Sequence, residues 1–309
     1  MKTEKEMPQK IDSYSLIKTF KNPRKGSIVL GIYKNSNGEE AIAKKWQGRI
    51  KNLEHYFLNN EINAYHLIHS LYEKHGTEIL DKFPSIHIPK LIKAIAEKNS
   101  LLLLVEKVEG ENLSNFNAKE KIKVMSEIIN YFKFLGSLID PDKKPLIIKR
   151  RGWFYVARFP SLLILAAIKH PFILPELIKA TYQSLLLMPY ILREKELFLV
   201  HRDFNYENIL VNRHTINVID LEYTALTSWI LNVAQIISES SKDKNLREIF
   251  YESPIVKEAL STKKSFRIYK AFFLYSAIFN IATEDEGEFN DNFLSIKEAI
   301  AISEKTYEK

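Results

Sequence analysis

The sequence contains no cysteine among its 309 residues. Disulfide bonds, thiolate nucleophiles and cysteine-ligated zinc sites are therefore excluded. The N-terminal stretch MKTEKEMPQKIDSY is charged throughout and lacks the apolar core of a secretory signal peptide. The longest apolar run, over residues 162–168, is shorter than the roughly 20 residues that span a bilayer. We therefore expect a cytoplasmic protein.

Acidic residues are fewer than basic ones, which gives a formal net charge of +7 and a pI of about 9.1. This excess favours anionic partners such as phosphates, nucleic acid or a lipid surface, without choosing among them. Hydrophobic residues make up 46% of the chain and charged residues 27%, as in an ordinary globular protein. A chain of this length can bury a large core in one two-lobed unit or two domains.

The hydrophobic pattern changes from mixed to mainly helical along the chain. We expect a loose arm over residues 1–12, a helix over 50–74 that ends at Gly76, and a buried helix pair over 146–196, with Pro189 kinking its second helix. The expected strands are 13–20, 28–34, 40–46, 91–97 and 101–108. The other expected helices are 118–138, 227–240, 245–260, 265–283 and 288–307.

Polar residues with ligand chemistry gather between Val200 and Tyr223. Short apolar segments there predict strands that end on a polar loop and on Asp220. Asp203 and Asn208 are five positions apart in the loop, so both side chains can point into one site. Carboxylate and amide oxygens are the ligands that Mg²⁺ prefers. The stretch therefore predicts a metal and a proton acceptor placed around a phosphate.

A cation for those phosphates is available upstream in the strand AIAKKW. Lys44 lies within this strand, and a buried lysine needs an anionic partner. Glu61, near the middle of the following helix, supplies a carboxylate, and Glu54 is its rival. These few groups are what phosphoryl transfer from ATP requires.

These strings resemble the protein-kinase-like superfamily, most closely its aminoglycoside phosphotransferase and choline kinase group. HRDFNYEN is similar to the catalytic loop, and VIDLEY to the strand that ends in the magnesium-binding aspartate. AIAKKW resembles the lysine strand, NEINAYHLI the glutamate helix, LLLLVEKVEGENL the strand entering the hinge, and KGSIV a nucleotide loop. The resemblance extends over roughly residues 14–240.

The resemblance implies an α+β bilobal fold. It has a small five-stranded N-lobe with one helix over residues 1–109, which binds nucleotide, and a larger, mainly helical C-lobe over residues 110–309, which carries catalysis and substrate binding. It further implies ATP and Mg²⁺ as cofactors and a catalytic base or orienting carboxylate at Asp203. Asn208 and Asp220 would bind metal, with Glu222 as a third metal or substrate carboxylate.

The same resemblance assigns the nucleotide contacts. Lys44, paired with Glu61, would hold the α- and β-phosphates, and Gly26 and Ser27 would cover them. Backbone groups from Glu106 to Val108 would meet adenine. His201 would brace the loop without taking part in the chemistry.

The chain departs from the family pattern at several positions. The G-x-G-x-x-G loop is missing, with only Gly26 and Gly31 present. Asp220-Leu221-Glu222 replaces Asp-Phe-Gly. Asn232 stands where the small-molecule kinases often carry the aspartate of Asp-Leu-Ala, which leaves the bracing role of that helix open.

The short segment between Asp220 and the next expected helix favours a small molecule as the phosphoryl acceptor. A protein kinase needs a long activation segment there, whereas the next helix is expected to start near Thr227. We therefore predict a phosphotransferase acting on a hydroxyl group of a sugar, aminoglycoside, amino alcohol or related metabolite. One alternative is a kinase of a lipid-linked or lipopolysaccharide sugar, with peripheral membrane contact through residues 149–170. Another is a nucleotide-binding pseudokinase. Nucleic-acid binding rests on charge alone and is not expected.

Overall fold

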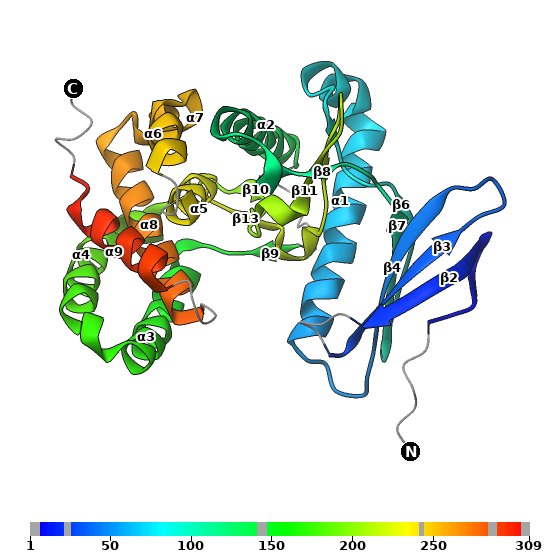
Figure 1. Cartoon of the computed structure of the whole chain (residues 1–309), viewed down its shortest axis with the longest axis horizontal. Coiled ribbons are helices and arrows are strands. Elements are labelled where there is room, and N and C mark those ends of the chain that lie inside the picture. The colour runs from blue at the N-terminus through cyan, green and yellow to red at the C-terminus, as the bar shows by residue number, and fades with distance from the viewer. Residues whose placement is uncertain (1–6, 22–25, 141–146, 241–243, 284–288, 304–309) are drawn as a thin grey trace. The chain divides into compact units, whose positions relative to one another are not determined.

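The computed structural model describes residues 7–21, 26–140, 147–240, 244–283 and 289–303. Contacts between Cα atoms divide the chain into two compact units. The sheet unit comprises residues 1–115, 138–148 and 205–224, and the helical unit comprises 116–137, 149–204 and 225–309. Two segments beyond the N-terminal 115 residues, 138–148 and 205–224, therefore belong to the sheet unit (Figure 1).

The main sheet of the sheet unit has six strands within the described residues, in the order β1-β2-β3-β4-β7-β6. All neighbouring strands are antiparallel. The strands are β1 (Lys10–Ile11), β2 (Tyr14–Lys21), β3 (Ile28–Lys34), β4 (Glu40–Gln47), β6 (Leu91–Glu97) and β7 (Ser100–Glu106). Gly38, with φ at +86°, follows Asn37 in the turn of the β3–β4 hairpin.

The prediction of a five-stranded sheet was wrong by one strand. Residues 7–12, expected as part of a loose arm, instead begin the fold. Asp12 adopts a left-handed conformation with φ at +49°, which lets β1 turn back onto β2. Met7 and Ile11 are then buried against the core around Tyr33 and Leu104, and this apolar burial outweighs the polar character of the arm.

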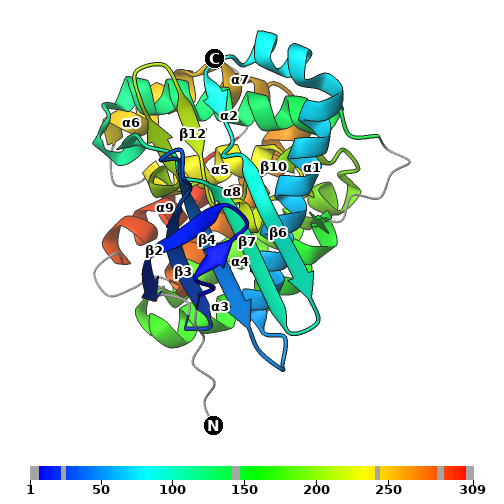
Figure 2. The same cartoon turned by 90° about the vertical axis from the view of Figure 1, so that its right-hand side faces the viewer.

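Helix α1 (Leu53–Lys82) lies against β4, β6 and β7 (Figure 2). Asn52 caps its N-terminus by accepting the backbone N–H of His55 at 3.0 Å. The helix does not end at Gly76 as predicted. The backbone kinks at His75, with φ at −128°, and the helix then continues to Lys82 because Ile79 is fully buried and anchors the last turns.

A second, four-stranded sheet in the sheet unit contains the strands that follow the polar loop. Its order is β5 (Ile86–His87), β12 (Ile216–Val218), β11 (Ile209–Val211) and β8 (Glu111–Asn112). β11 and β12 form an antiparallel hairpin in which Ile209 faces Val218. Asn208 precedes β11, and Ile219 and Asp220 follow β12, so the hairpin places Asn208 and Asp220 at the same end.

The helical unit contains a small sheet in which β10 (Phe198–Val200) pairs with β13 (Ala225–Thr227), beside β9 (Ile148–Lys149). Strand β13 was not predicted, and the next helix begins at Ile230, not near Thr227. Thr227 is instead paired with Phe198, because the cross-strand pairing with β10 competes successfully with the helical pattern. The exit from Asp220 to this helix is still short, at residues 221–229.

Helix α8 (Lys263–Thr283) is the buried centre of the helical unit, where α3, α4, α5, α7 and α9 contact it (Figure 1). The described helices are α2 (Ala118–Ser137), α3 (Gly152–Lys169), α4 (Leu174–Arg193), α5 (Ile230–Glu239), α6 (Lys244–Glu252), α7 (Pro254–Leu260) and α9 (Phe289–Ala301). The predicted helix 245–260 is interrupted at Ser253, because Pro254 starts a new helix.

The predicted helix pair 146–196 is present as α3 and α4, but only one side of it is buried. Tyr155 and Phe159 of α3 face the interior, whereas Trp153 and Ile168 are 64% and 73% exposed. Pro189 does not interrupt α4, and Pro160 likewise lies inside α3. Helix α3 is long and apolar enough to cross a membrane by length and composition, and 28% of it is buried.

Candidate active site

One lysine joins two carboxylates in the sheet unit. Lys44 Nζ donates to Glu61 Oε1 at 2.8 Å, to Glu61 Oε2 at 2.9 Å and to Asp220 Oδ1 at 2.7 Å. Strand β4 supplies Lys44, and α1 supplies Glu61, which is only 1% exposed. Asp220 follows β12 and comes from 176 positions farther along the chain. The predicted pairing of Lys44 with Glu61 is therefore present, while Glu54, the rival partner, binds elsewhere.

Asp220 has a strained backbone. Its φ of +58° and ψ of +64° lie in the left-handed region, which non-glycine residues rarely adopt. The short 3₁₀ helix η4 (Leu221–Tyr223) starts directly afterwards and returns the chain toward α1. Such strain persists only where the surroundings hold it, and it is concentrated at functional sites.

The turn after Asp220 is held by Asn60, a residue that sequence reasoning missed. Asn60 is 3% exposed, and its Nδ2 donates to the carbonyl oxygens of Glu222 and Thr224 at 2.8 Å each. Its Oδ1 accepts the backbone N–H of Ile148 at 3.1 Å. An asparagine beside Glu61 on the buried face of a helix is the signal that could have identified it.

Three carboxylates lie together around Lys44. One oxygen each from Glu61, Asp220 and Glu222 lie within 4.8 Å of one another, and Glu222 is 3% exposed. A single ammonium group cannot neutralise three carboxylates, so the cluster retains an excess of negative charge when all three are ionised. This oxygen-rich set fits Mg²⁺, which binds through carboxylates and water. Asn208 is adjacent, since its carbonyl oxygen accepts the Ile219 N–H at 3.0 Å.

The shared charge changes the proton affinities of both partners. Burial alone would lower the pKa of Lys44, but Glu61 and Asp220 outweigh burial and hold that pKa above its ordinary value. Burial, helped by the negative charges of Asp220 and Glu222, raises the pKa of Glu61 to about 7 despite the attraction of Lys44.

The residues predicted to contact nucleotide have partners of their own. The Ser27 backbone N–H donates to Glu54 Oε2 at 2.9 Å, and the Ser27 hydroxyl accepts from Asn52 at 2.7 Å. Gly26 is exposed, and residues 22–25 of the predicted loop lie outside the described residues. A carboxylate therefore holds one of the amides that was expected to cover a phosphate.

The predicted adenine-binding segment begins at the end of β7. The Glu106 backbone N–H donates to the Lys90 carbonyl at 3.0 Å, and its carboxylate accepts from the Lys90 N–H at 3.0 Å and contacts His87 Nε2 at 3.0 Å. Val108 follows the strand and is half-buried. Glu106 is thus held on both its backbone and its side chain. The adenine role of Glu106 to Val108 stays a prediction.

In the helical unit, the loop that bears Asp203 is clamped from α5. The His201 carbonyl accepts from Asn232 Nδ2 at 2.7 Å, and the Arg202 carbonyl accepts from Gln235 Nε2 at 3.0 Å. The His201 ring packs edge-on to Phe132 and Phe204, consistent with the predicted brace. Asn232 therefore supports the loop, although the predicted departure had left this role open. Gln235 was missed by the sequence reasoning. Asp203 itself is half-buried.

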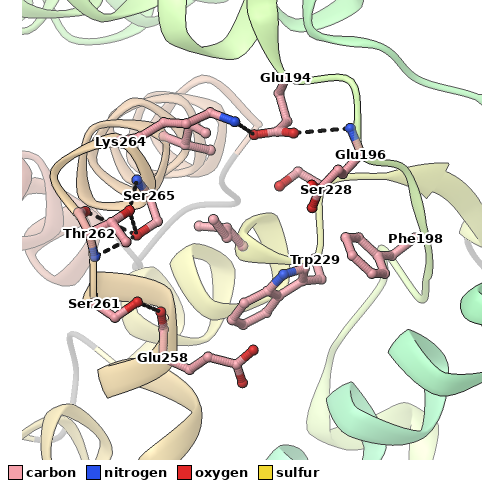
Figure 3. Close-up of a pocket in the computed structure, with 12 residues that line it drawn as sticks. Glu194, Glu196, Phe198, Ser228, Trp229, Glu258, Ser261, Thr262, Lys264 and Ser265 are labelled. Carbon is pink, nitrogen blue, oxygen red and sulfur yellow. Dashed lines mark hydrogen bonds and ion pairs between the residues drawn. The ribbon is translucent and has the colours of Figure 1, made fainter.

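A pocket of about 360 Å³ in the helical unit lies beside Phe198, the first residue of β10 (Figure 3). Asp203 instead follows the last residue of that strand, Val200. Phe198, Ser228 and Trp229 line it, and Glu194 is paired there with Lys264 at 3.3 Å. Glu258, also at its rim, is paired with Lys133 at 2.6 Å. None of the predicted site residues line this pocket.

The fold of the chain is that of the aminoglycoside phosphotransferases, which confirms the expected protein-kinase-like fold. The aminoglycoside phosphotransferase from Alicyclobacillus acidocaldarius matches with a TM-score of 0.60 over 99% of each chain, at 13% sequence identity. A thermostable variant of the aminoglycoside phosphotransferase APH(4)-Ia, in a ternary complex with ADP and hygromycin B, matches with a TM-score of 0.59 over 93% of each chain, at 12% identity.

A third similar structure is the amicoumacin kinase hAmiN in complex with AMP-PNP, Ca²⁺ and Ami. It matches with a TM-score of 0.53 over 94% of this chain and 89% of that chain, at 12% identity. No protein-family model and no curated protein sequence matches the chain. At these identities, the likeness establishes the fold.

The raised pKa of Glu61 predicts how stability depends on pH. Because the pKa is higher in the folded chain than the ordinary 4.5, protonation of Glu61 favours the folded state. The stabilisation that Glu61 gives to the folded state is therefore fully present below about pH 4.5 and is lost as the pH rises through about 7. Glu61→Gln cannot ionise, so this pH-dependent loss of stability should be absent in the variant. Urea unfolding in a metal chelator should show the variant gaining stability relative to wild type between pH 4.5 and pH 8. A constant difference across this range would contradict the assignment.

The clamp on the Asp203 loop predicts an asymmetric effect of substitution at Asn232. Asn232→Asp replaces the donor with an acceptor, so the buried His201 carbonyl loses its hydrogen bond and faces a carboxylate. Asn232→Ala loses the hydrogen bonds that the amide donates to the His201 carbonyl and to Gln235 Oε1, and should cost about 1–3 kcal/mol. Asn232→Asp should cost more. Chemical denaturation of both variants measures the difference. Equal stability of Asn232→Asp and wild type would show that the amide does not act as a donor.

Proposed function

We propose that the protein is an ATP- and Mg²⁺-dependent phosphotransferase that acts on a hydroxyl group of a small molecule. The observation that carries the proposal is the Lys44–Glu61–Asp220 constellation, with Glu222 beside it. A lysine held by a carboxylate next to an oxygen-rich cluster supplies a cation for phosphates and ligands for a metal. The fold it shares with phosphotransferases that bind ADP, AMP-PNP and Ca²⁺ supports the same conclusion.

Each residue of the site has a separate role in this proposal. Lys44 orients the α- and β-phosphates, and Asp220 and Asn208 hold Mg²⁺, with Glu222 as a further ligand. When bound, Mg²⁺ supplies charge neutralisation for the phosphates. Asp203 accepts or orients the proton of the acceptor hydroxyl, at the end of a loop held by Asn232 and Gln235.

The decisive experiment is substitution of the proposed base. Asp203→Ala should abolish phosphate transfer from ATP across a panel of sugars, aminoglycosides and amino alcohols, because the acceptor hydroxyl loses its proton acceptor. Removal of a general base typically lowers the rate by about 10²–10⁴-fold. Mass spectrometry of the products and release of ADP measure the turnover, and thermal melting checks that the variant is folded.

Asp81→Ala is a matched control, since Asp81 is an exposed aspartate on α1. It should leave turnover unchanged. Asp220→Asn should also abolish turnover, through loss of metal binding. If the wild type binds nucleotide but turns over no acceptor in the panel, a nucleotide-binding interaction module becomes the better account.

A second candidate function is favoured by the outer surface of α3 and α4. Among the described residues, eighteen large apolar side chains are exposed, and eleven of them lie between Trp153 and Leu192. On α3 they follow one helical stripe that includes Trp153, Ile164 and Ile168. On α4 a similar stripe includes Ile178 and Leu185. The two helices lie against each other (Figure 1). We call their exposed apolar side chains the α3–α4 face. Exposed apolar surface of this extent marks an interaction site.

The charges around the α3–α4 face favour an anionic bilayer over a second copy of the chain. Residues 149–193 contain seven basic side chains and one acidic side chain, Glu176. A second copy would bring two sets of basic residues together, whereas anionic lipids would neutralise them. Arg150 does not contribute, since it is buried, but Lys149, Arg151, Lys169 and Lys179 are exposed. The acceptor would then be a lipid-linked sugar.

Trp153 reports on this contact directly. It is the exposed tryptophan of the three, since Trp46 and Trp229 are buried. Vesicles that contain phosphatidylglycerol should shift its fluorescence to shorter wavelength and sediment the protein, and vesicles of phosphatidylcholine alone should do so far less. Ile164→Ser with Ile168→Ser should weaken binding by about tenfold or more.

Leu294→Ser removes an exposed leucine from α9, away from the α3–α4 face, and is the control, with binding unchanged. Equal binding of all variants would exclude the membrane contact. If the α3 substitutions instead changed the sedimentation coefficient without lipid, the face would be an interface between copies of the chain.

A further inference from the structure

Three arginines of the helical unit surround a pair of tyrosines. The rings of Tyr155 on α3 and Tyr275 on α8 contact each other edge-on, with centroids 5.2 Å apart. Arg202 Cζ lies 5.9 Å from the centroid of Tyr155. Arg158 Cζ lies 5.2 Å from the centroid of Phe279, which stacks on Tyr275. Arg150 Cζ lies 4.4 Å from the centroid of Phe154, which adjoins Tyr155. We call Arg150, Arg158 and Arg202 the arginine cluster.

The small sheet brings the cluster together from distant parts of the sequence. The Arg150 backbone N–H donates to the Leu226 carbonyl of β13 at 2.9 Å. Arg202 follows β10, which pairs with β13 through Val200 and Ala225. Arg158 lies one helical turn after Tyr155, whose hydroxyl is 3.0 Å from Thr227 Oγ1 of the same strand. Strand β13 therefore positions all three arginines.

The arginine cluster has no acidic partner. Within the described residues, no carboxylate forms an ion pair with any of the three. Arg150 is only 8% exposed, and its Nε–H and the Nε–H of Arg202 are buried without an acceptor. The hydroxyl of Tyr275 is also buried without a partner. Burial, together with the charges of Arg202 and Arg158, lowers the pKa of Arg150 to about 10.

Aromatic contacts do not compensate for this burial. A cation–π contact is a weak attraction, and a ring face offers no acceptor to the buried Nε–H groups. A buried charge without a counter-ion destabilises the folded state. An anion with two or more oxygens would satisfy both requirements, since guanidinium groups bind carboxylate and phosphate bidentately. Arg158 and Arg202 are half-buried, so one side of the cluster remains open to a ligand.

We infer that the arginine cluster binds an anionic group, a phosphate or a carboxylate, carried by the phosphoryl acceptor. Arg202 directly precedes Asp203, the proposed base, so an anion held there belongs to the molecule whose hydroxyl Asp203 addresses. The assignment of the anion to the acceptor rests on the proposed function, whereas anion binding itself does not. The acceptor class is then a sugar acid, a sugar phosphate or a similar anionic metabolite. An aminoglycoside, whose protonated amines would be repelled by three arginines, does not fit.

Anion binding can be measured without turnover. Inorganic phosphate, titrated at constant ionic strength, should raise the melting temperature of the full chain by several degrees once it exceeds its Kd about a hundredfold. Arg158→Gln and Arg150→Gln should each remove most of this rise. Lys44→Met should keep it, which separates the cluster from the nucleotide site. Arg213→Gln, an exposed arginine on the β11–β12 turn, is the matched control and should behave as wild type.

Without an anion, Arg150→Met should melt at the same temperature as wild type or higher, because it removes an unpaired buried charge. An unchanged or higher melting temperature would also show that the Arg150 variant is folded, so that a lost phosphate response reflects lost anion binding. A phosphate response that survives in both cluster variants and disappears in Lys44→Met would overturn the inference.

Turnover distinguishes the two sources of the anion and tests the link to catalysis. Matched acceptors that differ in one group, such as a neutral sugar, its uronic acid and its phosphate ester, should show a KM at least about tenfold lower for one of the anionic forms. Arg158→Gln should raise that KM with little change in kcat, and Arg158→Lys should restore it in part. Preference for the neutral sugar, unaffected by Arg158→Gln, would overturn the inference but leave the proposed function intact. Cluster-dependent phosphate binding with no acceptor turned over would leave the anion site standing and remove the proposed function.

Discussion

The sharing of one ammonium group among several carboxylates is the interaction on which the sheet unit depends. Lys44 on β4 binds both Glu61 on α1 and Asp220 after β12, so three elements meet at one charge. Glu222 adds a further carboxylate, which leaves the cluster with more negative than positive charge. Such an arrangement is costly without a cation. A metal ion bound together with a polyphosphate would offset this excess of negative charge.

Amide side chains hold one polar turn in the sheet unit and one polar loop in the helical unit. Asn60 donates to the turn that contains Glu222, and Asn232 and Gln235 donate to the loop that precedes Asp203. An amide can donate to a backbone carbonyl without adding charge, whereas a carboxylate cannot. The amide of Asn232 therefore supports the loop as a neutral donor to the His201 carbonyl.

The helical unit combines features that an ordinary soluble domain avoids. Among the described residues, it buries Arg150 without a carboxylate partner, and its helices α3 and α4 expose many large apolar side chains. Each feature lowers stability or solubility unless a ligand covers it. The two features favour different ligands, an anionic group for the arginine cluster and a lipid surface for the α3–α4 face. An acceptor that is both anionic and lipid-linked would satisfy both.

The sequence by itself predicted most helices and most strands of the main sheet, the protein-kinase-like fold and the pairing of Lys44 with Glu61. Local patterns and motif spacing carry this information, because apolar period and turn residues act over short distances. Only the tertiary structure decided the features that depend on distant segments. Strand β13 forms because β10 pairs with it, β1 joins the sheet because Met7 and Ile11 find a core, and Asn60 meets residues more than 160 positions away. The arginine cluster also depends on distant segments, since no local sequence pattern predicts that β13 brings Arg150 beside Arg202.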